Sequence, residues 1–211
     1  MALFQADPHH GNVVFNFRGQ PLKDLSAFAQ GYHLAGRALA QRMSNSSGYA
    51  DYEGYPILFL YRHALELYIK AIIYTGAKYV GLISDNKIDY EHFFRRHRLS
   101  KFLPALEVIW KHMNWDWDFG FDGMTNFEDF ANFITEVESV DPDSFSFRYP
   151  VMTNLKSTLP HHFVVNVISY AREMEPILDC LSGAVTGIDH DWQNACEIIY
   201  EAEQIIRDAL E

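Results

Sequence analysis

"YPILFLYRHALELYIKAII", residues 55–73, is apolar on nearly every side of a helical wheel. Four ionisable side chains interrupt it: Arg62, His63, Glu66 and Lys70. Residues four apart share a helix face, so these groups form one narrow stripe. A helix that is apolar over the rest of its surface is surrounded by other elements. The segment therefore predicts a central helix from residue 55 to about 75, which Gly76 is expected to end.

Apolar residues recur at helical spacing on both sides of this segment. They predict helices over about 21–44, 100–113, 125–137 and 160–176, and a last one over about 192–210. Polar stretches at 44–48 and 84–96 and "SGAVTG" at 182–187 are expected to separate helices, and Pro176 is expected to kink or split the helix that begins at Pro160. Five to six helices with short links predict an all-α, antiparallel up-and-down bundle. We expect one domain over 1–211, with 1–20 as an extended N-terminal segment.

Two features predict details at the ends of elements. Thr125 with Glu128 three residues later is typical of a capping box, so a helix should begin there. In "SFSFRYPV", 144–151, aromatic and apolar residues alternate with others, which indicates an extended arm. "VVFNF", 13–17, alternates similarly, so the two segments are candidates for pairing.

Composition excludes several classes of protein. The formal net charge of −11 makes the whole surface a poor ligand for nucleic acid, and no DNA partner is expected. A local basic segment, "FFRRHRLSK" at 93–101, is the exception. No apolar run is long enough to span a membrane, and the N-terminus does not resemble a signal peptide. The chain has only two cysteines, and both are expected to be reduced. Together these features predict a cytoplasmic protein.

The charged stripe has two interpretations. Arg62–Glu66 and Glu66–Lys70 suit ordinary helical ion pairs on a narrow solvated face. Alternatively, the stripe lines a groove in which Glu66 positions the two cations to bind an anion such as phosphate.

The order of three segments resembles the HEPN-like superfamily of helical bundles. They are the Arg-His-x-Leu-Glu-Leu-x-x-Lys helix at 62–70, "HRLSKFLPALEVIW" at 97–110 and "FRYPV" at 147–151. The resemblance is to an uncharacterised bacterial subgroup, and together with its flanks it covers about a third of the chain. It implies a helical, frequently dimeric protein; some members are metal-independent ribonucleases of toxin or defence systems, and others only bind RNA, nucleotides or proteins. The positions that transfer are Arg62, His63, Glu66, Lys70, His97 and Arg148.

The sequence departs from the ribonuclease members at their motif. Those members carry a histidine four to six residues after an arginine, and no arginine here has a histidine at that distance. A composite site is still chemically conceivable, because RNA cleavage without metal needs an acid, a base and cations near the phosphate. His97 and His63 are the candidate catalytic residues, and Arg62, Glu66, Lys70 and Arg148 are the candidate ligand-binding residues.

Two hypotheses on function follow. The first is an RNA- or nucleotide-binding, or RNA-cleaving, protein of a bacterial defence, toxin–antitoxin or stress context. The second is a non-catalytic dimerisation or protein-interaction module in which the stripe is a structural lock. The first predicts that Arg62, His97 and Arg148 converge on an open groove; the second predicts that they pair with Glu66 and are closed to solvent. We expect a homodimer, no cofactor and no metal site, since neither His9–His10 nor His161–His162 has chelating spacing.

Overall fold

The computed structural model describes residues 13, 14, 21–81 and 90–210, and these are helical for most of their length. Its elements are η1 (Pro21–Asp24), α1 (Leu25–Ser44), η2 (Asp51–Glu53), α2 (Gly54–Tyr79), α3 (Tyr90–Arg95), η3 (Leu99–Lys101), α4 (Leu103–His112), α5 (Phe127–Val140) and α6 (Val167–Leu210). No strand occurs within these ranges, so the predicted all-α bundle is confirmed. In the described residues, no helix is both long and apolar enough to cross a bilayer.

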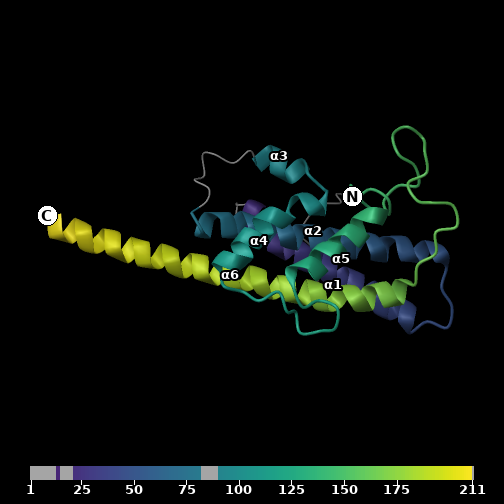
Figure 1. Cartoon of the computed structure of the whole chain (residues 1–211), viewed down its shortest axis with the longest axis horizontal. Helices are drawn as coiled ribbons and strands as arrows, with labels where there is room; N and C mark the ends of the chain where they lie inside the picture. Colours follow the sequence, from purple (N-terminus) through teal and green to yellow (C-terminus); the bar gives the residue numbers. More distant parts are fainter. Residues whose placement is uncertain (1–12, 15–20, 82–89, 211) are drawn as a thin grey trace.

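Helix α2 lies at the centre of the bundle, between α1 and α6 (Figure 1). Its apolar side chains are almost all buried, as expected for a helix that is apolar on most sides. Around it, α4 packs on α2, and α5 packs on η3. The sequence prediction of a central helix over 55–75 is therefore confirmed.

The direction of α6 differs from a simple up-and-down order. The short link between α1 and α2 makes that pair antiparallel. Helix α6 runs in the same direction as α2: the Tyr61 hydroxyl donates to Glu175, and 14 residues further along each helix Thr75 Oγ1 donates to Asp189 Oδ1 at 2.9 Å. The chain between them passes through α3, α4, α5 and a long loop, and so returns to the end where α2 begins (Figure 1).

Gly76 does not end α2, which continues to Tyr79. A Cβ atom added at Gly76 would lie 2.7 Å from Ile109 Cγ2 of α4 and 2.8 Å from Ile188 Cδ1 of α6. The glycine therefore allows three helices to approach closely, and its place in the sequence reflects packing rather than a helix stop. The predicted loop over 84–96 is also wrong in part, because α3 occupies Tyr90–Arg95; residues 84–89 lie outside the described part.

Helix α6 replaces two predicted helices. The first was expected to begin at Pro160, but 160–166 is loop, and neither Pro176 nor 182–187 interrupts the 44 residues that follow. A continuous apolar stripe explains this, because Leu178, Leu181 and Ile188 are all fully buried. At 1.5 Å per residue the helix is about 66 Å long, and its C-terminal part projects beyond the other helices (Figure 1).

The alternating segments do not form a strand pair. Residues 145–149 form a helical turn, with the Tyr149 N–H donating to the Phe145 carbonyl at 3.2 Å. Extended pairing occurs only just beyond, as an antiparallel bridge between Val151 and Ser157. Residues 15–17 of the second segment lie outside the described part of the chain, and Val13 and Val14 are exposed.

The capping box at the start of α5 is shifted by one residue from the prediction. Asn126 is the N-cap, and its Oδ1 accepts from the Asp129 N–H at 3.0 Å. The Asp129 carboxylate in turn accepts from the Thr125 N–H at 2.9 Å. Asparagine and aspartate thus replace threonine and glutamate, and the returning bond reaches the N–H of Thr125, one residue before the N-cap, rather than that of the N-cap itself.

Candidate functional site

The charged stripe of α2 is buried. Arg62, Glu66 and Lys70 are only 0%, 1% and 2% exposed. The interpretation of a narrow solvated face is therefore wrong. Charged groups at such depth are stable only when they are paired and hydrogen-bonded, so their partners decide what the stripe does.

Glu66 is the centre of the stripe. Its Oε1 accepts from Lys70 Nζ at 2.7 Å, and its Oε2 accepts from Arg62 Nη1 at 3.3 Å. His97 Nδ1 lies 2.9 Å from the same Oε1. Burial by itself would raise the pKa of Glu66, but Lys70, Arg62 and His97 together lower it below its ordinary value.

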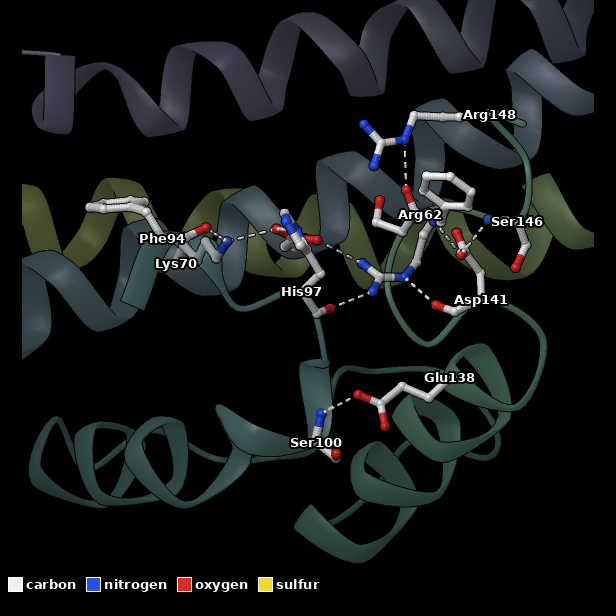
Figure 2. Close-up of polar contacts among 12 residues, drawn as sticks. Arg62, Lys70, Phe94, His97, Ser100, Glu138, Asp141, Ser146 and Arg148 are labelled. Atoms are coloured by element: carbon white, nitrogen blue, oxygen red, sulfur yellow. Dashed lines mark hydrogen bonds and ion pairs between the residues drawn. The ribbon is translucent and has the colours of Figure 1, made fainter. Parts of the chain in front are cut away.

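The two cations also hold backbone carbonyls of distant segments. Arg62 Nη2 donates to the His97 carbonyl at 2.7 Å, and Arg62 Nε donates to the Asp141 carbonyl at 3.4 Å. Lys70 Nζ donates to the Phe94 carbonyl at 3.1 Å (Figure 2). Helix α2 thus fixes the segment after α3 and the end of α5, where no regular backbone pairing is available. We name Arg62, Glu66, Lys70 and His97 the polar lock.

Two further hydrogen-bond groups extend the polar lock outward. Glu138 Oε1 accepts from the Ser100 N–H at 2.7 Å, which joins α5 to η3. Asp141 Oδ1 accepts from the N–H groups of Phe145 at 2.7 Å and Ser146 at 2.9 Å, which orders the turn after α5 (Figure 2). Ser100 therefore contributes to packing between elements rather than capping α4, whose N-cap is Phe102.

His97 differs from the other members of the polar lock because its side chain is 40% exposed. Its Nδ1 faces the buried carboxylate, so the other ring nitrogen is the one available to a ligand or to solvent. A carboxylate on one imidazole nitrogen fixes the orientation of the ring, as it does for many catalytic histidines. Among the predicted site residues, His97 alone combines this orientation with access to solvent.

His63 and Arg148 lie apart from Glu66. The His63 ring stacks on Phe59 with centroids 5.3 Å apart and meets Tyr32 edge-on at 4.6 Å. Burial lowers the pKa of His63 and outweighs the Glu66 carboxylate, which would raise it; Arg148 and Arg62 lower it further. The His63 Nδ1 has no hydrogen-bond partner in the described part of the chain. The imidazole is therefore held neutral, in an aromatic environment rather than in the polar lock.

Arg148 is exposed and belongs to the loop after α5. Its Nε donates to the Ser144 carbonyl at 2.7 Å (Figure 2). Its guanidinium lies over the Phe59 ring, with Cζ 5.5 Å from the centroid. The six residues that the family resemblance brings together therefore divide into the polar lock and a separate His63–Arg148 pair. The open groove that the first hypothesis predicted for Arg62, His97 and Arg148 is not formed.

A second ionic network was not anticipated from the sequence. Arg37 of α1 donates from Nε to Glu175 Oε2 at 2.6 Å and from Nη2 to Asp179 Oδ1 at 2.8 Å, both on α6. His33 Nε2 lies 3.3 Å from Glu175 Oε2, and the Tyr61 hydroxyl donates to the same carboxylate. The signal was present as two matched pairs four residues apart, His33/Arg37 and Glu175/Asp179, but they lie on helices whose adjacency the sequence does not show.

This second network contains side chains of the kind that bind metal ions, but its two carboxylates already pair with the Arg37 guanidinium. Ligand atoms of His33, Glu175 and Asp179 lie within 4.8 Å of one another. Burial would raise the pKa of Glu175, but hydrogen bonds from Arg37 and Tyr61 lower it. A metal ion would have to displace the Arg37 guanidinium. We therefore interpret this network as a set of ion pairs that holds α1 against α6.

Cys180 and Cys196 are both free, as expected for reduced thiols. They lie on the same helix, 16 residues and therefore about 24 Å apart, so they cannot form a disulfide with each other.

Comparison with known proteins returned no match: no family model, no curated protein and no solved structure resembles this chain significantly. The HEPN-like resemblance therefore stays a prediction from the sequence, and the function has to be argued from the geometry alone.

Proposed function

We propose that this protein is a non-catalytic, self-associating interaction module, whose polar lock stabilises the bundle and whose projecting part of α6 pairs with a second copy. The observation that carries the proposal is the exposure of large apolar side chains on that helix. Ile198, Ile199 and Ile205 are 67%, 58% and 69% exposed. With Ala202 they form one face, which we name the projecting stripe.

The projecting stripe continues a surface that is already buried in the body. Leu181 and Ile188 are each fully buried, and Ala195 and Ala202 continue the same seven-residue spacing beyond them. A seven-residue apolar repeat is the pattern of a helix that packs along another helix. Inside the body the other helices of the bundle cover this surface, but beyond about residue 193 none of the described elements does.

A second copy is the occupant that the stripe itself suggests. Two antiparallel copies of one apolar helix face are self-complementary, which is the requirement of a two-fold interface. A single helix of this length without tertiary contacts is marginal in water, so pairing would stabilise it. Burial of the polar lock supports the same assignment, because Arg62 and Lys70 are closed to any external ligand.

Sedimentation velocity tests the proposal. An Ile198→Glu/Ile205→Glu variant should sediment as a monomer at concentrations where the wild type sediments as a dimer, because the new charges would be buried in the interface. Leu155→Glu is the control, since Leu155 is 82% exposed in the loop between α5 and α6 and does not belong to the projecting stripe. A wild type that is monomeric throughout, or a dimer that both variants retain, would refute self-association through α6.

RNA binding at His97 is the second candidate function. His97 is held by a buried carboxylate and lies in the basic segment 93–101, where Arg95, Arg96 and Arg98 are exposed. The bacterial defence, toxin–antitoxin or stress context rests only on the family resemblance. Labelled single-stranded RNA should bind or be cleaved by the wild type, and His97→Ala should lower this at least about tenfold, whereas His112→Ala on α4 should not. Equal behaviour of the two folded variants would exclude this candidate.

A further inference from the structure

A groove of about 750 Å³ lies between α5 and the first part of α6, away from the projecting stripe; of the polar lock, only Arg62 reaches its lining. Its apolar lining includes Leu58 of α2, Phe133 and Val137 of α5, and Met174 and Ile177 of α6. Val164, in the loop that enters α6, lies at its margin and is 89% exposed. The volume is typical of sites that bind part of an organic ligand or a few peptide side chains.

Acidic groups face each other across this groove. Glu136 of α5 and Glu173 of α6 line it, and both are exposed. Neither carboxylate forms an ion pair in the described part of the chain, unlike those of the two ionic networks. Asp122 of the preceding loop and Asp129 of α5 add two more acids, and among the described residues of the lining the only cation is Arg62, whose guanidinium is committed to the polar lock. The groove therefore favours a cation and disfavours a phosphate.

The groove also holds an uncommitted hydrogen-bond donor. Tyr170 of α6 lines it, and its hydroxyl makes no hydrogen bond within the described residues. Burial raises the pKa of this phenol, so it is neutral and can donate. Tyr170 is half-buried, and a donor without a partner in the described residues suits a carbonyl supplied by a ligand.

We propose that the α5–α6 groove binds a basic amphipathic peptide segment of a partner protein. A large apolar side chain of the peptide fills the space over Met174 and Ile177, and its lysine or arginine side chains pair with Glu136 and Glu173. A backbone carbonyl of the peptide accepts from the Tyr170 hydroxyl. An amphipathic peptide fits better than a small cation, because the acidic groups lie on both walls and the apolar surface lies between them.

Fluorescence anisotropy with two labelled 14-residue peptides tests this inference. One has a helical pattern of leucine and lysine; in the other, glutamate replaces each lysine. The leucine–lysine peptide should bind saturably with one site per chain, and the leucine–glutamate peptide should not. A Glu136→Lys/Glu173→Lys variant should weaken binding at least about tenfold, because two charge pairs are reversed.

The matched control is Asp51→Lys/Glu107→Lys, which changes net charge equally on exposed positions of η2 and α4 that do not line the groove. It should alter affinity by less than about twofold, which separates the groove from general attraction to an acidic protein. Tyr170→Phe should weaken binding severalfold without changing its dependence on salt. Equal loss in both charge-reversal variants, or none in either, would overturn the proposal. If the groove variant loses self-association instead, a second copy occupies the groove and the inference is wrong.

Discussion

At the scale of single residues, Glu66 is the carboxylate that pairs with the charged side chains around it. One buried carboxylate accepts from Lys70 and Arg62 and contacts His97, while the two cations hold three backbone carbonyls. The sequence indicated that these residues share a face, because their spacing of four is a property of the helix. It did not indicate whether that face was exposed to solvent or buried, because burial depends on segments 94–97 and 141–146, which lie far away along the chain.

Replacing Glu66 with glutamine should be strongly destabilising. The substitution keeps the shape but leaves Arg62 and Lys70 without their counter-charge in the interior, which typically costs about 3 to 5 kcal/mol. Urea unfolding followed by circular dichroism measures the loss. Glu107→Gln, on the exposed side of α4, is the control and should change the free energy of unfolding by less than about 0.5 kcal/mol. A Glu66→Gln variant as stable as the control would show that the stripe is not a lock.

The same residue makes the free energy of unfolding depend on pH in the acid range. The pKa of Glu66 is lowered in the folded protein from an ordinary value of 4.5. The native state therefore stabilises the charged carboxylate more than the unfolded chain does. Its contribution to stability is present above about pH 4.5 and is lost as the pH falls through the lower, folded-state pKa. The free energy of unfolding between pH 7 and pH 3 should therefore fall less in Glu66→Gln than in the wild type. Parallel curves for the two proteins would contradict this.

At the scale of elements, the periodicity of the apolar residues determined the extent of the helices more strongly than single glycine and proline residues did. The sequence predicted the central helix correctly, because its apolar residues cover most of the wheel over 55–75. It was wrong where glycine and proline were interpreted as ends. Gly76 lies inside α2 because two isoleucines of neighbouring helices leave no room for a side chain. Pro176 and Gly183 lie inside α6 because the buried stripe through Leu178, Leu181 and Ile188 continues past them.

The two helical glycines give opposite predictions for substitution by alanine. Gly76→Ala should destabilise the protein by about 1 to 3 kcal/mol, because the new Cβ overlaps the side chains of Ile109 and Ile188. Gly183→Ala should stabilise it by about 0.5 to 1 kcal/mol, because no atom lies within 4 Å and alanine is the better helix former. Thermal or urea unfolding of both variants measures the difference. Similar changes in the two would show that close packing is not the reason for Gly76.

At the scale of the whole molecule, the chain separates a closed body from exposed surfaces. In the body, the Arg37–Glu175 network joins α1, α2 and α6, the polar lock joins α2 to the segments that follow it, and the apolar core packs among them. The projecting stripe and the acidic groove are the surfaces that these contacts leave open. Neither could be predicted from the sequence, because the pattern of the last helix is the same whether the bundle covers it or not.

Salt should distinguish a second copy from another partner at the projecting stripe. From Trp192 to Ile205 the helix carries Glu197, Glu201 and Glu203 and no lysine or arginine. Two copies therefore bring like charges together, so raising the salt concentration should strengthen self-association by screening them. Sedimentation velocity at about 0.05 M and 0.5 M salt measures this. Dissociation at high salt would mean that the interface depends on opposite charges, which residues 192–205 do not have.

Hydrogen–deuterium exchange of residues 192–205 as a function of protein concentration tests the central claim most directly. An unpaired projecting helix exchanges quickly, whereas the same helix in a dimer is protected. We predict that protection of this segment rises with concentration, while protection of α2 stays constant. Rapid exchange in 192–205 at every concentration, with α2 fully protected, would show that the body folds alone and that α6 does not pair with a second copy.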